Sequence, residues 1–414
     1  MSYDLWDLYL ATRKERLAQR LAKTDELLES ARNDQHVFGI GQVLSEVDRE
    51  VRIRCAESGR PRSMLMFASN SYLNLNTHPA LRRAAKEAIN SFGLGTGGSA
   101  AFNGHTRLHQ MLEERFAELL GTESAILFPS GYAANVGVVS GLLRPKDRLI
   151  GDDHVHASCW DGAKTAGVRR TQRFRHNDLD DLREHLGEEV SPDADTYAVV
   201  ESVYSMEGDR APLPEFVALC EENNAIWIVD NAHGVGVYED ALVRDLESAN
   251  GVGGVITASF AKGYGVPGGV AGGSSALMDH LRFLSRSHVF STSLSPVIVA
   301  AALEGMDLLE RDPTIRERLW MNVEYLTKKL TPFGVDQNGG SPIVIVPVPE
   351  EMDAKKAAKI LYDEGILVNY SAFPAVPREE QRFRICVMSR HTNADLDRLE
   401  KAFERVWSSC LQGA

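Results

Sequence analysis

One lysine lies in a stretch of sequence where a charge is unusual. Lys262 is the single charged residue between Ile256 and Gly269, and its neighbours are mostly small, apolar or glycine. A buried ammonium group costs several kcal/mol unless it is paired or neutralised. A partly desolvated lysine can instead lose its proton and form a Schiff base with a carbonyl group. The segment therefore indicates either a lysine that reacts with an aldehyde cofactor or a surface turn with a solvated side chain.

An acid and a histidine follow another apolar run. Asp230 comes directly after the run from Ala225 to Val229, and His233 comes three residues later. A carboxylate here could cap a helix, bind a metal, or face the ring nitrogen of pyridoxal phosphate, which must stay charged to act as an electron sink. In the last case His233 would hydrogen-bond the phenolic oxygen of the ring. Otherwise it is a core histidine behind a helix N-cap.

Two acids and two histidines form a third polar group, which comprises Asp152, Asp153, His154 and His156. Along an extended chain the two histidines would share one face, as metal ligands often do. No further ligand motif accompanies them, so we expect no metal. We interpret His156 as a flat ring stacked on a cofactor.

Several residues have the chemistry to bind anions. Ser130–Asn135 lies where a strand should turn into a helix, and the N–H groups of a helix N-terminus suit a phosphate. Ser259, three residues before the lysine, could add a hydroxyl. Gly95–Ser99 is either an anion-binding loop or a flexible turn. Arg384 could hold a carboxylate through a bidentate pair or belong to a surface ion pair.

The elements that must position these groups alternate along the chain. From about residue 66 to 300, short apolar strands alternate with helices, a pattern typical of a mostly parallel α/β sheet covered by helices. The expected strands are SAILFPSG, DRLIGDD, YAVVESVYS, AIWIVDNAH, GVITASF and SSALM, and the expected helices include HQMLEERFAELLG and LPEFVALCEENN. Catalytic groups in such sheets lie at the carboxyl ends of strands, so we expect the polar groups to converge there.

Three domains are predicted from this pattern. Residues 66–300 would form the large cofactor-binding domain. Residues 301–414 would form a smaller α+β domain, with a helix at AALEGMDLLERD and strands at PIVIVPVP, ILVNYS and RFRICVMS. Residues 1–65 would form an N-terminal helical arm, with helix over about residues 1–50. The leucines that favour this helix are Leu5, Leu8, Leu17, Leu21 and Leu28.

Composition narrows the class of protein. The chain has 414 residues, of which 43% are hydrophobic and 25% charged, which is typical of a globular protein. No apolar run approaches the roughly 18 residues of a membrane helix, and no secretory signal is recognisable. Five scattered cysteines favour a reduced, cytoplasmic protein. A formal net charge of −13 argues against general nucleic-acid binding.

A set of motifs that runs in order along the chain resembles a known family. The motifs are SNSYLNL, GTGGSAAFNGHTRLHQMLEE, FPSGYAANVG, HASCWDGA, ESVYSMEGDRAPL, VDNAHGVGV, SFAKGYG and FRICVMSRHT. Together they are similar to the α-oxoamine synthases, which are fold-type I pyridoxal-phosphate enzymes. The resemblance extends from about residue 65 to the end, and it implies a homodimer whose active site is shared between the subunits.

The resemblance also implies roles for individual residues. Lys262 matches the Schiff-base lysine, Asp230 the acid at the pyridine nitrogen, and His233 its neighbour at the phenolic oxygen. The other matches are His156 as the stacking ring, Gly131, Tyr132 and Ser259 as phosphate contacts, Ser205 as a cofactor serine, Ser291 and Thr292 as phosphate contacts from the second subunit, and Asn70 and Arg384 as substrate-carboxylate contacts.

The reaction that the resemblance implies is a decarboxylative Claisen condensation. An α-amino acid would condense with acyl-CoA or an acyl-carrier protein and give an α-aminoketone, carbon dioxide and a free thiol. Two alternatives stay open: a pyridoxal-phosphate aminotransferase, and an inactive paralogue that serves as a partner subunit. Ala100 and Ala375 stand where relatives often carry arginine and threonine. Both positions lie near the family's substrate sites, so the amino acid and the acyl chain stay undetermined.

Overall fold

The computed structural model describes residues 15–33, 42–55, 58–244, 246, 253–336, 340–371, 376 and 380–411. Leu5, Leu8 and Ala375 lie outside these described residues. The chain forms two compact units, one of Asn70–Glu317 and one that combines Met1–Ser69 with Arg318–Ala414. The division into an arm, a cofactor-binding domain and a C-terminal domain stays a prediction.

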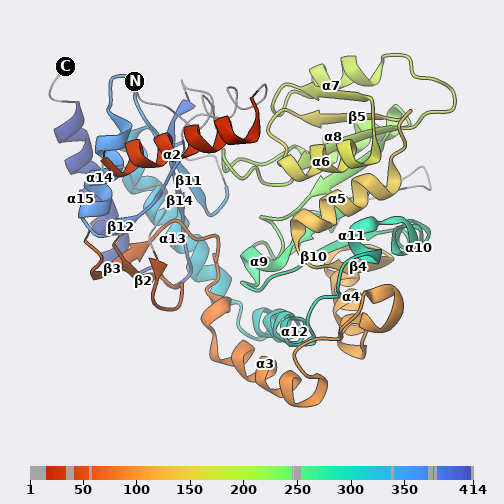
Figure 1. Cartoon of the computed structure of the whole chain (residues 1–414), viewed down its shortest axis with the longest axis horizontal. Helices are drawn as coiled ribbons and strands as arrows, with labels where there is room; N and C mark the ends of the chain where they lie inside the picture. The colour runs from red at the N-terminus through yellow and green to blue at the C-terminus, as the bar shows by residue number, and fades with distance from the viewer. Residues whose placement is uncertain are drawn as a thin grey trace. The chain divides into compact units, whose positions relative to one another are not determined.

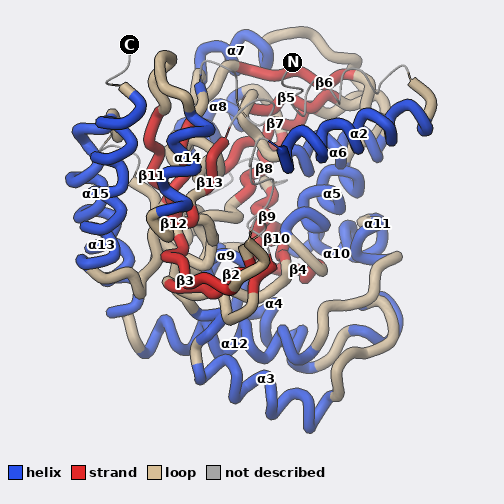
Figure 2. The backbone as a smooth tube through the Cα atoms, turned by 60° about the vertical axis from the view of Figure 1, so that its left-hand side comes forward, coloured by secondary structure: helices blue, strands red, loops and turns tan. Residues whose placement is uncertain are grey.

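The larger unit, Asn70–Glu317, is built on a sheet of seven strands within its described residues (Figures 1 and 2). In spatial order the strands are β4 (Ser124–Phe128), β10 (Gly269–Gly273), β9 (Val255–Ser259), β8 (Ile226–Asp230), β7 (Thr196–Glu201), β5 (Arg148–Asp152) and β6 (Arg170–Phe174). From β9 to β6 all neighbours are parallel, whereas β10 is antiparallel to β4 and to β9. The predicted α/β class with a mostly parallel sheet is confirmed.

Helices join these strands and pack against the sheet. Those of the larger unit are α3 (Pro79–Phe92), α4 (Arg107–Leu120), α5 (Gly131–Leu142), α6 (Ala157–Ala166), α7 (Leu179–Leu186), α8 (Leu213–Glu222), α9 (Phe260–Gly263), α10 (Ser275–Leu284), α11 (Arg286–Val289) and α12 (Pro296–Arg311), with α13 (Thr314–Leu330) crossing into the other unit. Short 3₁₀ and π turns lie at Leu75–Thr77 and Ala100–Gly104. The helices predicted from HQMLEERFAELLG and LPEFVALCEENN correspond to α4 and α8.

The sheet interior explains why the polar groups gather at one edge. Every residue of β5, β7 and β9 is buried, as expected for parallel strands covered on both faces, and so is every residue of the antiparallel β10. Polar side chains can reach solvent or ligand only where such strands end. Two helices begin just past these ends, capped by Ser130 before α5 and by His156 before α6.

One predicted strand is wrong. SSALM begins α10, because the Ser274 side chain accepts a hydrogen bond from the Leu277 N–H and caps a helix. The strand lies just before it, at the glycine-rich β10, which β-propensity disfavours. Close packing requires the glycines: a Cβ on Gly269 would lie 2.3 Å from the Ser130 carbonyl oxygen. The edge strand β6 was not among the expected strands either.

The smaller unit contains two further sheets. One has the order β1 (Gln42–Val43), β2 (Glu50–Arg54), β3 (Pro61–Met66), β12 (Ile366–Leu367), and the other the order β11 (Ile343–Pro347), β14 (Arg382–Cys386), β13 (Asn369–Ser371). The helices of this unit are α2 (Leu17–Asn33), the later part of α13 with the 3₁₀ turn Thr331–Phe333, α14 (Ala354–Asp363) and α15 (Asn393–Cys410). ILVNYS therefore divides between two sheets: Ile366 and Leu367 pair with β3, whereas the residues from Asn369 pair with β14.

The N-terminal region differs from the continuous helix expected over residues 1–50. Among its described residues only Leu17–Asn33 is helical, and the strands β1 and β2 follow. In β2, Val51 and Ile53 point inward and join a cluster with Met64, Met66, Leu367 and Met388. This two-residue period is the strand signal that the leucine spacing obscured. Nowhere in the described part of the chain is a helix both long and apolar enough to span a membrane.

Candidate active site

Asp230 is the centre of a buried hydrogen-bond network at the end of β8. Its side chain is 5% exposed. Oδ2 accepts a hydrogen bond from Asn135 Nδ2 at 2.6 Å, and Oδ1 accepts one from the Ala232 N–H at 3.0 Å. Two donors on a buried carboxylate favour its charged form. The geometry thus maintains a negative charge at this strand end.

Asn135 connects Asp230 to the end of β5. The side chain of Asn135 projects from α5, is buried, donates to Ser158 Oγ at 2.8 Å and accepts from the Thr257 hydroxyl. Ser158 Oγ in turn lies 2.7 Å from His156 Nδ1. The network therefore joins the predicted ring acid to the predicted stacking histidine and fixes one ring nitrogen of His156. The rest of the His156 ring stays accessible to a ligand, because this residue is exposed.

His233 lies three residues after Asp230, just past the end of β8. Its side chain is buried, and its Nδ1 is 2.7 Å from the hydroxyl of Tyr72. The same hydroxyl is 3.3 Å from Asn70 Oδ1, to which it donates. The Tyr72 hydroxyl thus connects Asn70, a predicted substrate contact, to His233, a predicted cofactor contact.

The N-terminus of α5 approaches the end of β9. A Cβ on Gly131 would lie 2.5 Å from Ser259 Cβ, so only glycine fits there without displacing the serine. Ser130 Oγ caps the helix by accepting from the Ala133 N–H at 3.1 Å. Tyr132, beside Gly131, places its ring edge-on to His156 with centroids 6.4 Å apart. Three predicted cofactor contacts, Gly131, Tyr132 and Ser259, are thus brought together.

Lys262 follows directly, in the short helix α9 that begins after Ser259. It is half-buried, whereas the other residues of α9 are buried, apart from the exposed Ala261. Its positive charge lowers the pKa of Glu201, the last residue of β7. The lysine is therefore a partly desolvated group within the field of the strand-end carboxylates.

Glu201 and Ser205 occupy the end of β7. Glu201 is 3% exposed, and its Oε2 accepts the Ser205 N–H at 3.2 Å. Burial raises the pKa of Glu201 well above its ordinary value, and the nearby charge of Asp230 raises it further. Ser205 thus reaches this edge, as expected, through a turn fastened to Glu201.

A cluster of acids and histidines lies at the adjoining end of β5. His176 Nδ1 is 3.0 Å from Asp152 Oδ1, and its Nε2 is 2.9 Å from Asp209 Oδ2. Burial alone would lower the pKa of His176, but the two carboxylates outweigh it and raise the pKa to about 10. His154 stacks on His176 at 4.1 Å and comes within 3.2 Å of Glu207 without hydrogen-bond geometry.

This cluster resembles a metal site only in composition. Ligand atoms of Asp152, His154 and His176 all lie within 4.8 Å of one another. However, each nitrogen of His176 faces a carboxylate, so the ring is a doubly hydrogen-bonded cation with no lone pair to offer. The cluster fastens the loop that carries Asp209 to the ends of β5 and β6.

The remaining predicted site residues are Ser291, Thr292 and Arg384. Among the described residues, no hydrogen bond links Ser291 or Thr292 to Gly131, Tyr132 or Ser259; Ser291 Oγ is 3.4 Å from the Thr292 carbonyl oxygen. Arg384 belongs to the smaller unit, where it is buried in the central strand β14 and its Nη1 is 3.0 Å from Cys386 Sγ. Its role as a carboxylate contact stays a prediction.

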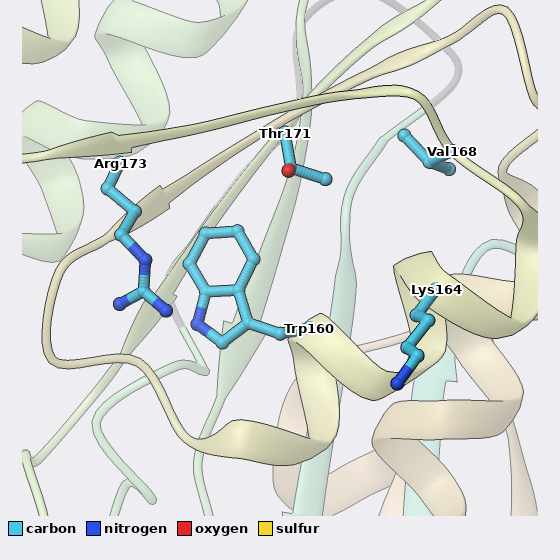
Figure 3. Close-up of a pocket in the computed structure, with 5 residues that line it drawn as sticks. All are labelled: Trp160, Lys164, Val168, Thr171 and Arg173. Carbon is cyan, nitrogen blue, oxygen red and sulfur yellow. The ribbon is translucent and has the colours of Figure 1, made fainter. Parts of the chain in front are cut away.

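A separate hollow lies on the outer side of α6 and β6 (Figure 3). It encloses about 570 Å³ and is lined by Trp160, Lys164, Val168, Thr171 and Arg173. The Arg173 guanidinium stacks on the Trp160 ring at 4.5 Å and pairs with Asp153 at 3.0 Å. None of the predicted site residues lines this hollow.

Sequence reasoning missed four buried groups of the centre. They are Tyr72, Asn135, Ser158 and Glu201, all inside the motifs quoted above. Asn135 offered a usable signal, because an amide five residues after a helix N-cap and within a mostly apolar helix is costly to bury without partners.

Comparisons with known proteins agree with this geometry. The model of the family "Aminotransferase class I and II" matches residues 62–403. An 8-amino-7-oxononanoate synthase of Symbiobacterium thermophilum is 34% identical over 390 residues, which cover 93% of this chain and 98% of the relative. A serine palmitoyltransferase of Sphingobacterium spiritivorum is 34% identical, covering 83% of this chain and 86% of the relative.

Solved structures give the same result for the fold. A serine palmitoyltransferase from S. paucimobilis, with a bound PLP–myriocin aldimine, superimposes with a TM-score of 0.84 at 30% identity, covering 95% of this chain and 99% of that one. The match of sequence, fold and strand-end chemistry over nearly the whole chain shows that the protein belongs to the aminotransferase class I and II family and, within it, to the α-oxoamine synthases.

Proposed function

We propose that the protein catalyses the decarboxylative condensation of an α-amino acid with an acyl thioester, releasing an α-aminoketone, carbon dioxide and a free thiol. Membership of the α-oxoamine synthases makes it a pyridoxal-phosphate-dependent acyltransferase. The observation that carries the proposal is the buried Asp230 carboxylate, held by two N–H donors beside the strand that leads to Lys262.

The residues present fit pyridoxal 5'-phosphate. Because residue 131 is glycine, the N-terminus of α5 can approach Ser259 more closely than a side chain would allow, which brings the helix N–H groups beside the Ser259 hydroxyl, as a phosphate cradle requires. Lys262 would hold the aldehyde carbon, and Asp230 would hold the proton of the ring nitrogen. His156 would lie against the ring face, and His233 would face the phenolic oxygen. When bound, the cofactor supplies an electron sink for the charge that develops at the amino-acid Cα.

The chain's own groups would then divide the work of the reaction. Lys262, half-buried and next to carboxylates, would remove and return the proton at Cα, a contribution of about 10²–10⁴-fold for a general base. Tyr72 would fix the orientation of His233 through its 2.7 Å contact. Asn70 and Arg384 would bind the substrate carboxylate.

A homodimer with a shared site is part of the proposal. The segment around Gly98 lies against the segment that carries Ser291 and Thr292, since the Ser293 N–H donates to the Gly98 carbonyl oxygen. Large apolar side chains are exposed in both segments, notably Phe102 (86%) and Phe290 (75%). A second copy that covers them would bury this apolar surface and bring Ser291 and Thr292 to the partner's phosphate cradle. We also place the protein in the cytoplasm.

Thiol release tests the proposal. The PLP-loaded protein is given pooled amino acids with acyl-CoAs of graded chain length, then with an acyl-carrier protein, and products are identified by mass spectrometry. We expect free thiol only when an amino acid is present, and a product mass that lacks one carbon dioxide. Lys262→Ala is the control and should release none. Amino-group transfer to a keto acid without thiol release would instead identify an aminotransferase and refute the condensation.

A further inference from the structure

Two carboxyl groups lie side by side at the centre of the site. Glu201 ends β7 and Asp230 ends β8, and the two residues are direct partners in the parallel register. Both side chains are buried, with exposures of 3% and 5%. Two neighbouring buried carboxyl groups rarely both ionise, because each charge disfavours the other.

The hydrogen bonds of the two groups are unequal. Each Asp230 oxygen accepts an N–H, from the Asn135 side chain at 2.6 Å and from the Ala232 backbone at 3.0 Å. Glu201 accepts one N–H, from Ser205 at 3.2 Å, and its other oxygen, Oε1, is buried with no hydrogen-bond partner among the described residues. An unpaired buried carboxylate oxygen is far more costly than an unpaired neutral hydroxyl. The geometry therefore assigns the charge to Asp230 and the proton to Glu201.

The surrounding charges support the same assignment. Burial raises the pKa of Glu201 most strongly, and Asp230 and Glu207 raise it further, whereas Lys262 and the Ser205 N–H lower it. The net direction is well above the ordinary value.

We propose that Glu201 is a positioning residue that keeps a proton in the working enzyme and so confines the single negative charge of the pair to Asp230. The inference rests on the proposed function, in which Asp230 faces the ring nitrogen of the cofactor. Glu201 acts through Asp230: as a neutral neighbour it fills the space beside the carboxylate without adding a second charge to the site.

Infrared spectroscopy of the PLP-loaded protein tests this charge state directly. A protonated carboxylic acid has a carbonyl stretch above the amide band, and labelling with ¹³C-glutamate shifts that stretch. We expect one such band at neutral pH, absent from Glu201→Gln and retained in Glu207→Gln, which removes a neighbouring glutamate. Absence of the band from the wild-type protein, or its persistence in Glu201→Gln, would overturn the inference.

Cofactor affinity provides a second readout. Glu201→Ala leaves the space beside the Asp230 carboxylate empty and should weaken PLP binding by about tenfold, a change of roughly 1.4 kcal/mol. Glu201→Gln should restore the affinity, because an uncharged amide has the shape of the protonated acid. Failure of glutamine to restore it would show that the ionised form is needed and would refute the inference.

The two proposals fail in different ways. The infrared band concerns a charge state and requires no turnover. If the band is absent while thiol is still released, the role of Glu201 is wrong and the condensation stands. If the band is present but no acyl thioester is consumed, the charge assignment stands and the condensation is wrong.

Discussion

Replacement of Asn135 by alanine should weaken PLP binding more than its effect on folding explains. The side chain donates 2.6 Å to Asp230 and 2.8 Å to Ser158 and accepts from Thr257. Asn135→Ala removes a hydrogen bond to a charged group, which contributes about 1.5–3 kcal/mol. If that stabilisation acts on the charged carboxylate that faces the ring nitrogen, the PLP dissociation constant should rise by about 10- to 150-fold.

The assay is a titration of the apoenzyme with PLP, followed by absorbance, together with a thermal melt of the apoenzyme. Asn322→Ala is the matched control, because Asn322 is also buried and its amide group also takes part in three hydrogen bonds. Those bonds go to the backbone carbonyl oxygens of Met388, Ser389 and His391. Both variants should melt at lower temperature, and only Asn135→Ala should lose cofactor affinity. Equal PLP affinity in Asn135→Ala and wild type would refute the role given to this amide.

Two further outcomes are expected. Tyr72→Phe removes the hydroxyl that lies 2.7 Å from Nδ1 of the buried His233, and the loss of one hydrogen bond costs about 0.5–1.5 kcal/mol. Condensation kinetics should show a lower kcat/KM, and an unchanged value would contradict the importance of this contact. His176 has a pKa raised to about 10, so its ion pairs with Asp152 and Asp209 contribute stability below pH 6.5 that is lost as the pH rises through about 10. The alkaline fall in melting temperature should therefore be smaller in His176→Gln, and an identical fall would show that other groups cause it.

The scaffold was predictable wherever an apolar run ends in polar residues. The runs before Asp230 and Ser259 are long enough and apolar enough to be buried strands, and their ends are the only places where such residues can meet a ligand. Local sequence therefore predicted which residues lie at the edge of the sheet. It also predicted that a helix begins within Ser130–Asn135, and the structure starts α5 at Gly131.

The contacts that complete the centre depend on tertiary structure. Nothing near Tyr72 in the sequence indicates His233, which is 161 residues away. The glycine-rich strand β10 has low strand propensity, and its first glycine is required by tertiary packing, because a Cβ on Gly269 would lie too close to the N-terminus of α5. Glu201 looks like an ordinary strand-end acid until its register partner is known to be Asp230.

The order of strands in the large sheet has a consequence for folding during synthesis on the ribosome. The first strand along the chain, β4, has as its neighbour the last one, β10, with β9 next beyond it. During synthesis the ribosome must therefore release about 270 residues before the cradle at Gly131 meets Ser259. Until then the edge of β4 has no neighbouring strand, and Lys262 has no completed cofactor site around it. PLP therefore binds late in the synthesis of each chain. A truncated translation product that ends before β10 should bind no PLP and so remain colourless.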